Sequence, residues 1–135
     1  GAAKRIVMCS GKIYYDLADA RDAAEAWDIE ILRVEQLYPF PSKTTFELLS
    51  KTPNAEVIWC QEEPKNMGGW TFVRDFIEDA MQAANLKQSR LKYAGRPAAA
   101  SPATGSSARH VKEQKQLVAE ALGPMVAASQ KAGPT

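Results

Sequence analysis

The sequence contains few cysteines and histidines. Its 135 residues include Cys9 and Cys60 as the only cysteines and His110 as the only histidine. One cysteine pair does not make the disulfide framework of a small secreted domain, and no second cysteine or histidine lies at metal-ligand spacing. We therefore expect two buried strand thiols. For His110 we expect a solvated helix position, because no acid or nucleophile can be assigned to it.

The chain also lacks an excess of either charge and any long apolar run. Lys plus Arg number 17 and Asp plus Glu number 16, so no surplus of positive charge favours a phosphate backbone or an anionic membrane. The mostly apolar runs are strand-sized, far below the roughly 20 residues that cross a bilayer. We expect an intracellular protein with neither nucleic acid nor membrane as its partner.

Hydrophobic patterning alternates between strand and helix along the chain. Short β-branched or alternating runs predict strands, and apolar residues three and four apart predict a helix after each of them. The expected strands are 5–9, 29–34, 55–60 and 90–95. This order predicts an α/β fold with three layers (αβα), in which helices cover both faces of a mostly parallel sheet. Residues 1–126 are expected to form a single domain, and 127–135 a flexible C-terminal tail.

Several polar signals mark the expected helix ends. Thr44 and Glu47 have capping-box spacing for a short second helix. Ser107 is expected to cap the last helix, which Gly123 and Pro124 should end. The small residues of 96–107 are expected to run over the surface.

Ligands of a parallel sheet bind where strands end and helices begin, so a nucleotide-binding motif would lie in the loops there. The segment CSGK at 9–12 resembles a phosphate loop, but it lacks the earlier glycine and the following Ser or Thr. No GxGxxG follows the first strand. These loops are predicted to lie along one edge without a nucleotide triphosphate or dinucleotide site.

The segment WCQEEPKNMGGW at 59–70 carries the densest set of unusual residues. Adjacent glutamates in an extended segment point to opposite sides, so they do not form a catalytic pair. Pro64 is expected to bend the chain, and Gly68 and Gly69 to permit a tight turn or a close approach. The two tryptophans are expected to be semi-exposed. The segment predicts a packing interface formed by Trp59, Glu62, Glu63, Pro64, Lys65, Gly68, Gly69 and Trp70.

Four segments of the sequence resemble one enzyme family. They are VMCSGKIYYDL (7–17), RVEQLYPFP (33–41), PNAEVIWCQEEPKNMGGW (53–70) and YAGRPAAASPATG (93–105). In this order they look like the C-terminal domain of the E1 component of 2-oxoglutarate dehydrogenase, which is similar to a transketolase C-terminal domain. The resemblance extends from about residue 5 to residue 123.

The resemblance implies an enzyme that uses thiamine diphosphate and magnesium to decarboxylate 2-oxoglutarate and passes the succinyl group to the lipoyl arm of E2. In that family the cofactors lie between domains that precede this one, so no catalytic, cofactor or metal residue is assigned here. The isolated chain is expected to be inactive and to brace an E1 homodimer. The expected location is the cytoplasm of a bacterium or the mitochondrial matrix of a eukaryote.

Some members of this family bind an allosteric nucleotide or acetyl-CoA in this region. For an acetyl-CoA or AMP effector the sequence offers Arg96, Arg33 and Lys12, whose cationic groups suit phosphates. Structural salt bridges to neighbouring acids are an equally good interpretation of each.

Two other functions stay open from the sequence. One is a free-standing α/β module that binds an acyl-CoA or an adenine nucleotide at the strand edge. The other is a domain of a pyruvate or branched-chain E1 or of transketolase. Only the resemblance of the segments EQLYPFP and QEEPKNMGGW to the 2-oxoglutarate dehydrogenase family argues against it.

Overall fold

The chain folds around a four-stranded parallel sheet. The computed structural model describes residues 3–98, 107–124 and 126. Its strands are β1 (Arg5–Cys9), β2 (Ile29–Arg33), β3 (Glu56–Pro64) and β4 (Lys92–Arg96). Their spatial order is β2-β1-β3-β4, and every neighbouring pair is parallel. The strands therefore all end at one edge of the sheet, called here the carboxyl edge.

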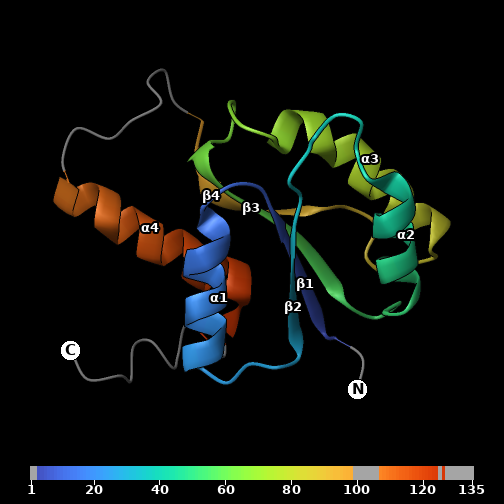
Figure 1. Cartoon of the computed structure of the whole chain (residues 1–135), viewed down its shortest axis with the longest axis horizontal. Helices are drawn as coiled ribbons and strands as arrows, with labels where there is room; N and C mark the ends of the chain where they lie inside the picture. Colours follow the sequence, from blue (N-terminus) through green and yellow to red (C-terminus); the bar gives the residue numbers. More distant parts are fainter. Residues whose placement is uncertain (1–2, 99–106, 125, 127–135) are drawn as a thin grey trace.

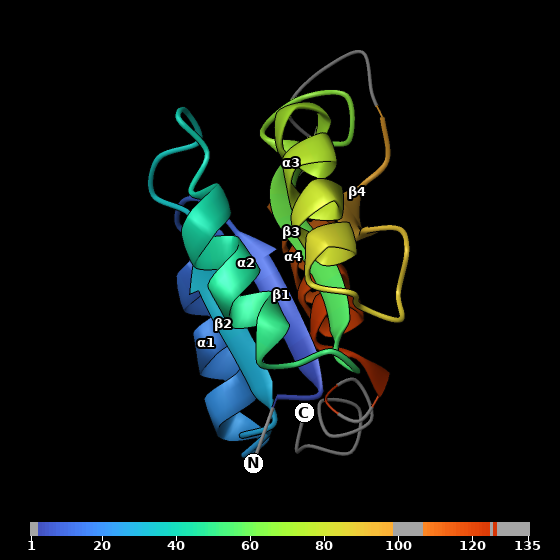
Figure 2. The same cartoon turned by 90° about the vertical axis from the view of Figure 1, so that its right-hand side faces the viewer.

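Helices cover both faces of this sheet. They are α1 (Ile13–Ala23), α2 (Ser42–Ser50), α3 (Trp70–Ala83) and α4 (Ser107–Leu122). Figure 1 shows α1 and α4 on one face and α2 and α3 on the other. In Figure 2 the view is onto α2 and α3, with the sheet behind them. The fold is thus the three-layer αβα arrangement that the alternating pattern predicts.

Two apolar cores hold the layers together, one on each face of the sheet. Ile6 and Met8 of β1 join the core under α2 and α3, whereas Val7 and Cys9 join the core under α1 and α4. Successive strand residues point to opposite faces, so the continuously apolar β1 supplies both cores. The same holds for residues 57–60 of β3, which alternate between the two cores, so residues 6–9 and 57–60 are continuously apolar in the sequence.

The predicted strands are confirmed, but several boundaries differ from the expected ones, two of them by two residues or more. β3 continues through Pro64 instead of ending at Cys60, because β4 pairs with it as far as Pro64 and Arg96. The register between β3 and β4 shifts between Gln61 and Pro64, and the polar residues at the end of β3 lie at this shift. β4 begins at Lys92, two residues later than expected, and forms the edge beside β3.

The predicted capping box at the second helix was also wrong. α2 begins at Ser42 with Pro41 before it, and its N-terminus has no side-chain cap. Proline suits a helix start because its φ is already fixed and it has no N–H to satisfy. The hydroxyl of Thr45 instead donates a hydrogen bond to the Pro41 carbonyl at 2.9 Å. Thr44, the predicted cap, is exposed.

The last helix ends as expected, at Leu122, and Gly123 follows with a φ of +99°. The Ser107 side chain, most of the small-residue segment and the predicted tail at 127–135 lie outside the described residues. Within the described part of the chain, no helix is both long and apolar enough to cross a membrane.

Cys9 and Cys60 are free and buried, as expected, and they are register partners on β1 and β3. Burial raises the pKa of Cys9 to about 12 and raises the pKa of Cys60 further above its ordinary range. Both thiols are therefore protonated near neutral pH.

The buried thiols make stability sensitive to alkaline pH. A thiol with an ordinary pKa of 9.0 ionises in the unfolded chain before the folded one does. The free energy of unfolding should thus be steady below pH 9 and fall above it, by up to about 1.4 kcal/mol per pH unit for each thiol. Urea unfolding at pH 7 to 10.5 measures this. A double Cys9→Ala, Cys60→Ala variant should show a shallower fall, and an equal fall in both proteins would contradict the assignment.

Candidate functional site at the carboxyl edge

The carboxyl edge gathers the loops that the sequence singles out, but it does not gather the predicted phosphate ligands at one point. Arg33 ends β2 and Arg96 ends β4, and these strands are the two edges of the sheet. Three strand spacings separate their backbones by roughly 14 Å. Lys12 lies between them in the β1–α1 loop, with its side chain exposed. No single phosphate group would bridge Arg33 and Arg96.

The loop after β3 is organised by the carboxamide of Gln61, which is only 2% exposed. Its Oε1 accepts hydrogen bonds from the indole Nε1 of Trp59 and the backbone N–H of Trp70, both at 2.9 Å. Its Nε2 donates to the backbone oxygens of Glu63, Pro64 and Met67 at 2.8 to 3.1 Å. One side chain thereby ties the end of β3 to the start of α3.

The two tryptophans lie in the core, so the expectation that they are semi-exposed was wrong. Trp59 is fully buried and Trp70 is 7% exposed. The reason is local packing: Gly69 lies against the Trp59 ring, where a Cβ would come within 2.8 Å of Cζ2. Gly68 has a φ of +67°, which turns the chain before α3. The expected tight turn and close approach are thus confirmed, one at each glycine.

Substitution of Gly69 by alanine should test this close approach. The added methyl group would collide with the Trp59 indole, and we expect the free energy of unfolding to fall by about 1–3 kcal/mol. Urea unfolding measures the loss. In a Trp59→Phe background, which lacks the Cζ2 atom, the same substitution should cost much less. An equal cost in both backgrounds would contradict the proposed clash.

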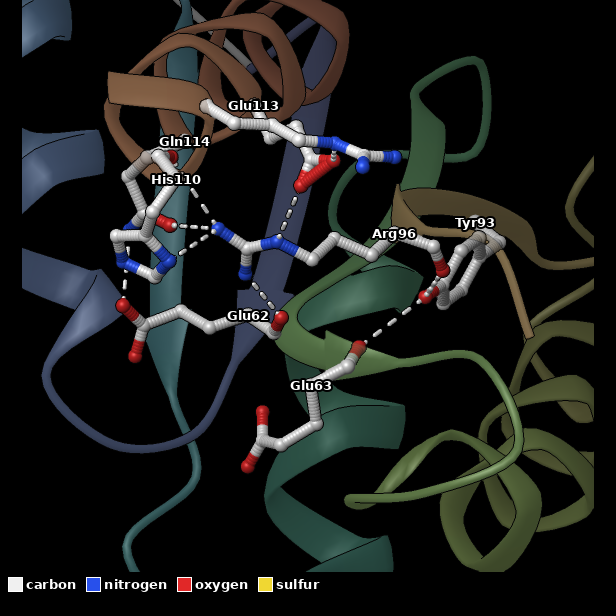
Figure 3. A network of polar contacts seen from close by, with 8 residues as sticks. Glu62, Glu63, Tyr93, Arg96, His110, Glu113 and Gln114 are labelled. Carbon is white, nitrogen blue, oxygen red and sulfur yellow. Dashed lines mark hydrogen bonds and ion pairs between the residues drawn. The ribbon is translucent and has the colours of Figure 1, made fainter. Parts of the chain in front are cut away.

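A second polar cluster surrounds Arg96, which is 9% exposed (Figure 3). Its Nε forms an ion pair with Glu113 of α4 at 3.3 Å, and its Nη1 donates to the Glu62 carbonyl oxygen. Its Nη2 faces His110 Nδ1 and Gln114 Oε1, each at 3.2 Å. Each guanidinium nitrogen therefore already has a protein partner, and the group fastens α4 to the ends of β3 and β4.

Glu62 and Glu63 point apart, as the extended backbone predicts. Glu62 extends toward α4, where its carboxylate accepts from Gln114 Nε2 at 2.8 Å, whereas Glu63 points away from the cluster and is exposed (Figure 3). The same Gln114 amide donates to Asp16 of α1 at 2.8 Å. The carboxylates are thus separated, and the arrangement connects α1, β3 and α4 without forming an acid–base pair.

His110 is exposed on the first turns of α4, in agreement with its expected solvated position. Its Nδ1 lies 3.2 Å from Arg96 Nη2, which is a donor, so a hydrogen bond between them requires Nδ1 to be the acceptor. The contact positions the ring beside a cation rather than beside a nucleophile.

A groove of about 470 Å³ lies between α1 and α4, next to this cluster. Asp16 and Asp19 line its α1 side, and Lys115 lines its α4 side. Two carboxylates beside one ammonium group make it a poor phosphate site. Gln114 also spans it by its hydrogen bond to Asp16.

Arg33 packs on aromatic rings instead of pairing with an acid. Its guanidinium carbon lies 5.7 Å from the Tyr14 ring centroid and 5.2 Å from that of Tyr15, and its Nη1 donates to the Tyr15 hydroxyl at 3.3 Å. Its Nε is buried and has no hydrogen-bond partner among the described residues. Among the predicted phosphate ligands, Arg33 thus keeps a cationic group without a carboxylate partner in the described structure.

Tyr93 of β4 closes the edge beside α3. Its hydroxyl donates to the Arg96 carbonyl at 2.6 Å, and its ring meets Trp70 edge-on at 5.0 Å. Burial raises the pKa of Tyr93 to about 12, so the phenol keeps its proton at neutral pH. Lys65 lies over both rings, with its Nζ 5.7 Å from Trp70 and 5.3 Å from Tyr93. Of the predicted interface residues, Glu63, Lys65 and Gly68 are exposed.

The sequence interpretation missed Gln61, Gln114 and Glu113. Gln61 had one available signal, because it directly follows a run of apolar strand residues and lies between two tryptophans that need a polar partner. Gln114 and Glu113 had none, since on a helix pattern they are ordinary polar positions. Only the packing of α4 on the sheet brings them to Arg96.

The described residues contain no group of three or more His, Cys, Asp or Glu side chains that could hold a metal ion. The fold and this edge define a three-layer α/β domain whose polar side chains mainly fasten its own elements to one another. Comparison with known proteins places it more closely. The chain belongs to the family described as 2-oxoglutarate dehydrogenase C-terminal, whose sequence model matches residues 1–122.

Individual relatives agree with this assignment. The chain is 49% identical over 120 residues to the 2-oxoglutarate dehydrogenase E1 components of Brucella anthropi, Brucella ovis and Brucella abortus. The match covers 89% of this chain but only 12% of each relative. The resemblance in the four sequence motifs is thereby confirmed, and the free-standing binding module is not favoured.

Proposed function

We propose that this chain acts as the C-terminal structural and regulatory domain of a thiamine-diphosphate-dependent 2-oxoglutarate dehydrogenase E1. The complete enzyme would decarboxylate 2-oxoglutarate and transfer the succinyl group to the lipoyl arm of E2. The observation that carries the proposal is the match to a C-terminal family over residues 1–122, together with 49% identity to E1 components. The homodimer partner and the cytoplasmic location belong to the same proposal.

The polar edge supports a structural role within that enzyme. Arg96, Glu113 and Gln114 form bonds that fasten α4 to the strand ends. Mg²⁺ and thiamine diphosphate would be held by the parts of E1 that precede this domain, as the family resemblance implies. The role proposed for this domain is to keep its surfaces in a fixed shape against those parts.

A hybrid E1 tests the structural part. In it, this chain replaces the matching C-terminal region of the Brucella anthropi relative. With E2, thiamine diphosphate and Mg²⁺, the hybrid should release CO₂ from 2-oxoglutarate and succinylate the lipoyl arm at a rate within about tenfold of the parent enzyme. The isolated 135-residue chain should release no CO₂ from 2-oxoglutarate. A stable but inactive hybrid, or decarboxylation by the isolated chain, would overturn the proposal.

The regulatory part concerns an acetyl-CoA or AMP effector. Lys12 is exposed and Arg33 has no acid partner in the described structure, so they are the more available of the predicted phosphate ligands. Titration calorimetry of the hybrid with each effector should give heat that a Lys12→Ala, Arg33→Ala variant loses. Binding that is unchanged in this variant would remove the regulatory site from this edge, without affecting the structural role.

A further inference from the structure

The two halves of α4 are held to the rest of the domain in different ways. The second half is buried in the core under α1 and α4 through Leu117, Val118, Ala121 and Leu122. In the first half, none of residues 108–116 is buried, and the apolar Val111 is 52% exposed. Figure 1 shows the start of α4 extending away from the sheet, past α1. Residues 108–116 therefore add no buried side chain to either apolar core.

Polar side chains fasten this first half instead. Gln114 Oε1 accepts a hydrogen bond from Arg96 of β4 at 3.2 Å. The Nε2 of the same side chain donates to Asp16 of α1 and to Glu62 of β3, each at 2.8 Å. Glu113 adds its ion pair with Arg96 at 3.3 Å. Gln114 thus joins the first half of α4 to three other elements of the domain.

A helix segment held by polar bonds opens more readily than one held by an apolar core. Short helices are marginal in water and depend on tertiary packing for their stability. A hydrogen bond inside the protein replaces one to water, so its net contribution is modest, whereas a buried apolar side chain leaves water altogether. Segments with few buried apolar contacts accordingly open while the rest of a protein stays folded. The boundary of such an opening in α4 falls between Gln116 and the buried Leu117.

We propose that residues 108–116 form a latch, which opens as a unit while the rest of the domain stays folded. The bonds of Gln114 and Glu113 to Arg96 lock it in the closed position. Opening frees the Arg96 guanidinium, apart from its bond to the Glu62 carbonyl oxygen. It also withdraws from the groove beside α1 the lining residues His110, Val111, Gln114 and Lys115. The latch thereby controls access to Arg96 and to this groove.

Amide hydrogen exchange of the 135-residue chain, measured where reclosing is faster than exchange, distinguishes opening of the latch from global unfolding. The amides of 112–116 bond to carbonyls of the latch, and those of Ala121 and Leu122 bond to carbonyls beyond it. Ile77→Val weakens the core on the opposite face of the sheet, so it destabilises the closed and open forms equally relative to the unfolded chain. Exchange at Ala121 and Leu122 should become about two- to tenfold faster, and exchange at 112–116 should not change.

Gln114→Ala tests the lock. It weakens the closed form alone, so exchange at 112–116 should become about tenfold faster. Exchange at Ala121 and Leu122 should accelerate by the same factor, since both openings start from the closed form. Gln116→Ala is the matched control, because Gln116 is exposed and its side chain bonds Glu120 of the same helix at 3.5 Å. This control should change exchange by less than about twofold.

Three results would overturn the latch. If Ile77→Val accelerates 112–116 as much as Ala121 and Leu122, the first half opens only when the whole domain unfolds. If Ile77→Val accelerates β1 but neither part of α4, the helix opens as one unit. If Gln114→Ala and Gln116→Ala have equal effects, the bonds of Gln114 do not lock the segment.

Discussion

A Gln61→Leu variant should lose about 4 kcal/mol of unfolding free energy. Leucine fills a similar volume but offers no polar atom to the indole N–H of Trp59, the N–H of Trp70 or the carbonyls that Gln61 now bonds. A buried polar group left without a partner costs about 1–3 kcal/mol. Several groups lose their partner together, although carbonyls in the exposed part of the loop can turn to water. Urea unfolding followed by tryptophan fluorescence measures the loss.

Two companion variants make this result specific. Gln82→Leu changes the same residue type at an exposed position of α3, and it should shift stability by less than about 0.5 kcal/mol. Gln61→Glu keeps an acceptor for both N–H groups but removes the donors to the Glu63, Pro64 and Met67 carbonyls. It should therefore also destabilise strongly. A Gln61→Leu protein within 1 kcal/mol of the parent would show that the carboxamide does not organise this loop.

An Arg96→Met variant should lose about 3 kcal/mol of unfolding free energy. Methionine keeps much of the apolar stem but leaves the Glu62 carbonyl without its donor and Glu113 with only the exposed Arg109 as a cationic partner. Removal of one member of a buried ion pair typically costs about 3–5 kcal/mol, and the half-buried Glu113 recovers part of this by hydration. Amide hydrogen exchange should become faster along α4, because Arg96 joins this helix to the strand ends.

Arg109 provides the matched control for Arg96. It pairs with the same Glu113 at 3.3 Å, but its side chain is 72% exposed. An exposed pair contributes at most about 1 kcal/mol, so Arg109→Met should leave both the stability and the exchange of α4 nearly unchanged. If Arg96→Met and Arg109→Met behaved alike, the buried position of Arg96 would have no structural role, and a ligand-binding role for its guanidinium would become the better explanation.

The predicted phosphate ligands Arg96 and Arg33 have similar positions in the sequence pattern but different surroundings in the structure. Each of them lies at the end of a strand or in the loop after one, so the sequence alone does not distinguish them. The structure surrounds Arg96 with protein acceptors but places Arg33 on the rings of Tyr14 and Tyr15. An effector could therefore reach Arg33 and Lys12 without breaking the bonds that hold α4.

The sequence pattern also failed to predict which aromatic side chains are buried. Trp59 and Trp70 were expected to be semi-exposed because they flank a loop, yet the Gln61 carboxamide and Gly69 bring them into the core. Among the described residues, the most exposed aromatic side chains are instead Tyr38 and Trp27, at 78% and 68%.

By itself, the sequence determined the alternation of strands and helices, the three-layer α/β class and the family. These properties depend on hydrophobic periodicity and local motifs, which act over a few residues. Only the tertiary structure decided which polar side chains meet. Gln114 bonds Asp16 across 98 positions of the chain, and Arg96 reaches Glu113 on a separate helix. Such contacts depend on how complete elements pack, and no local pattern encodes that packing.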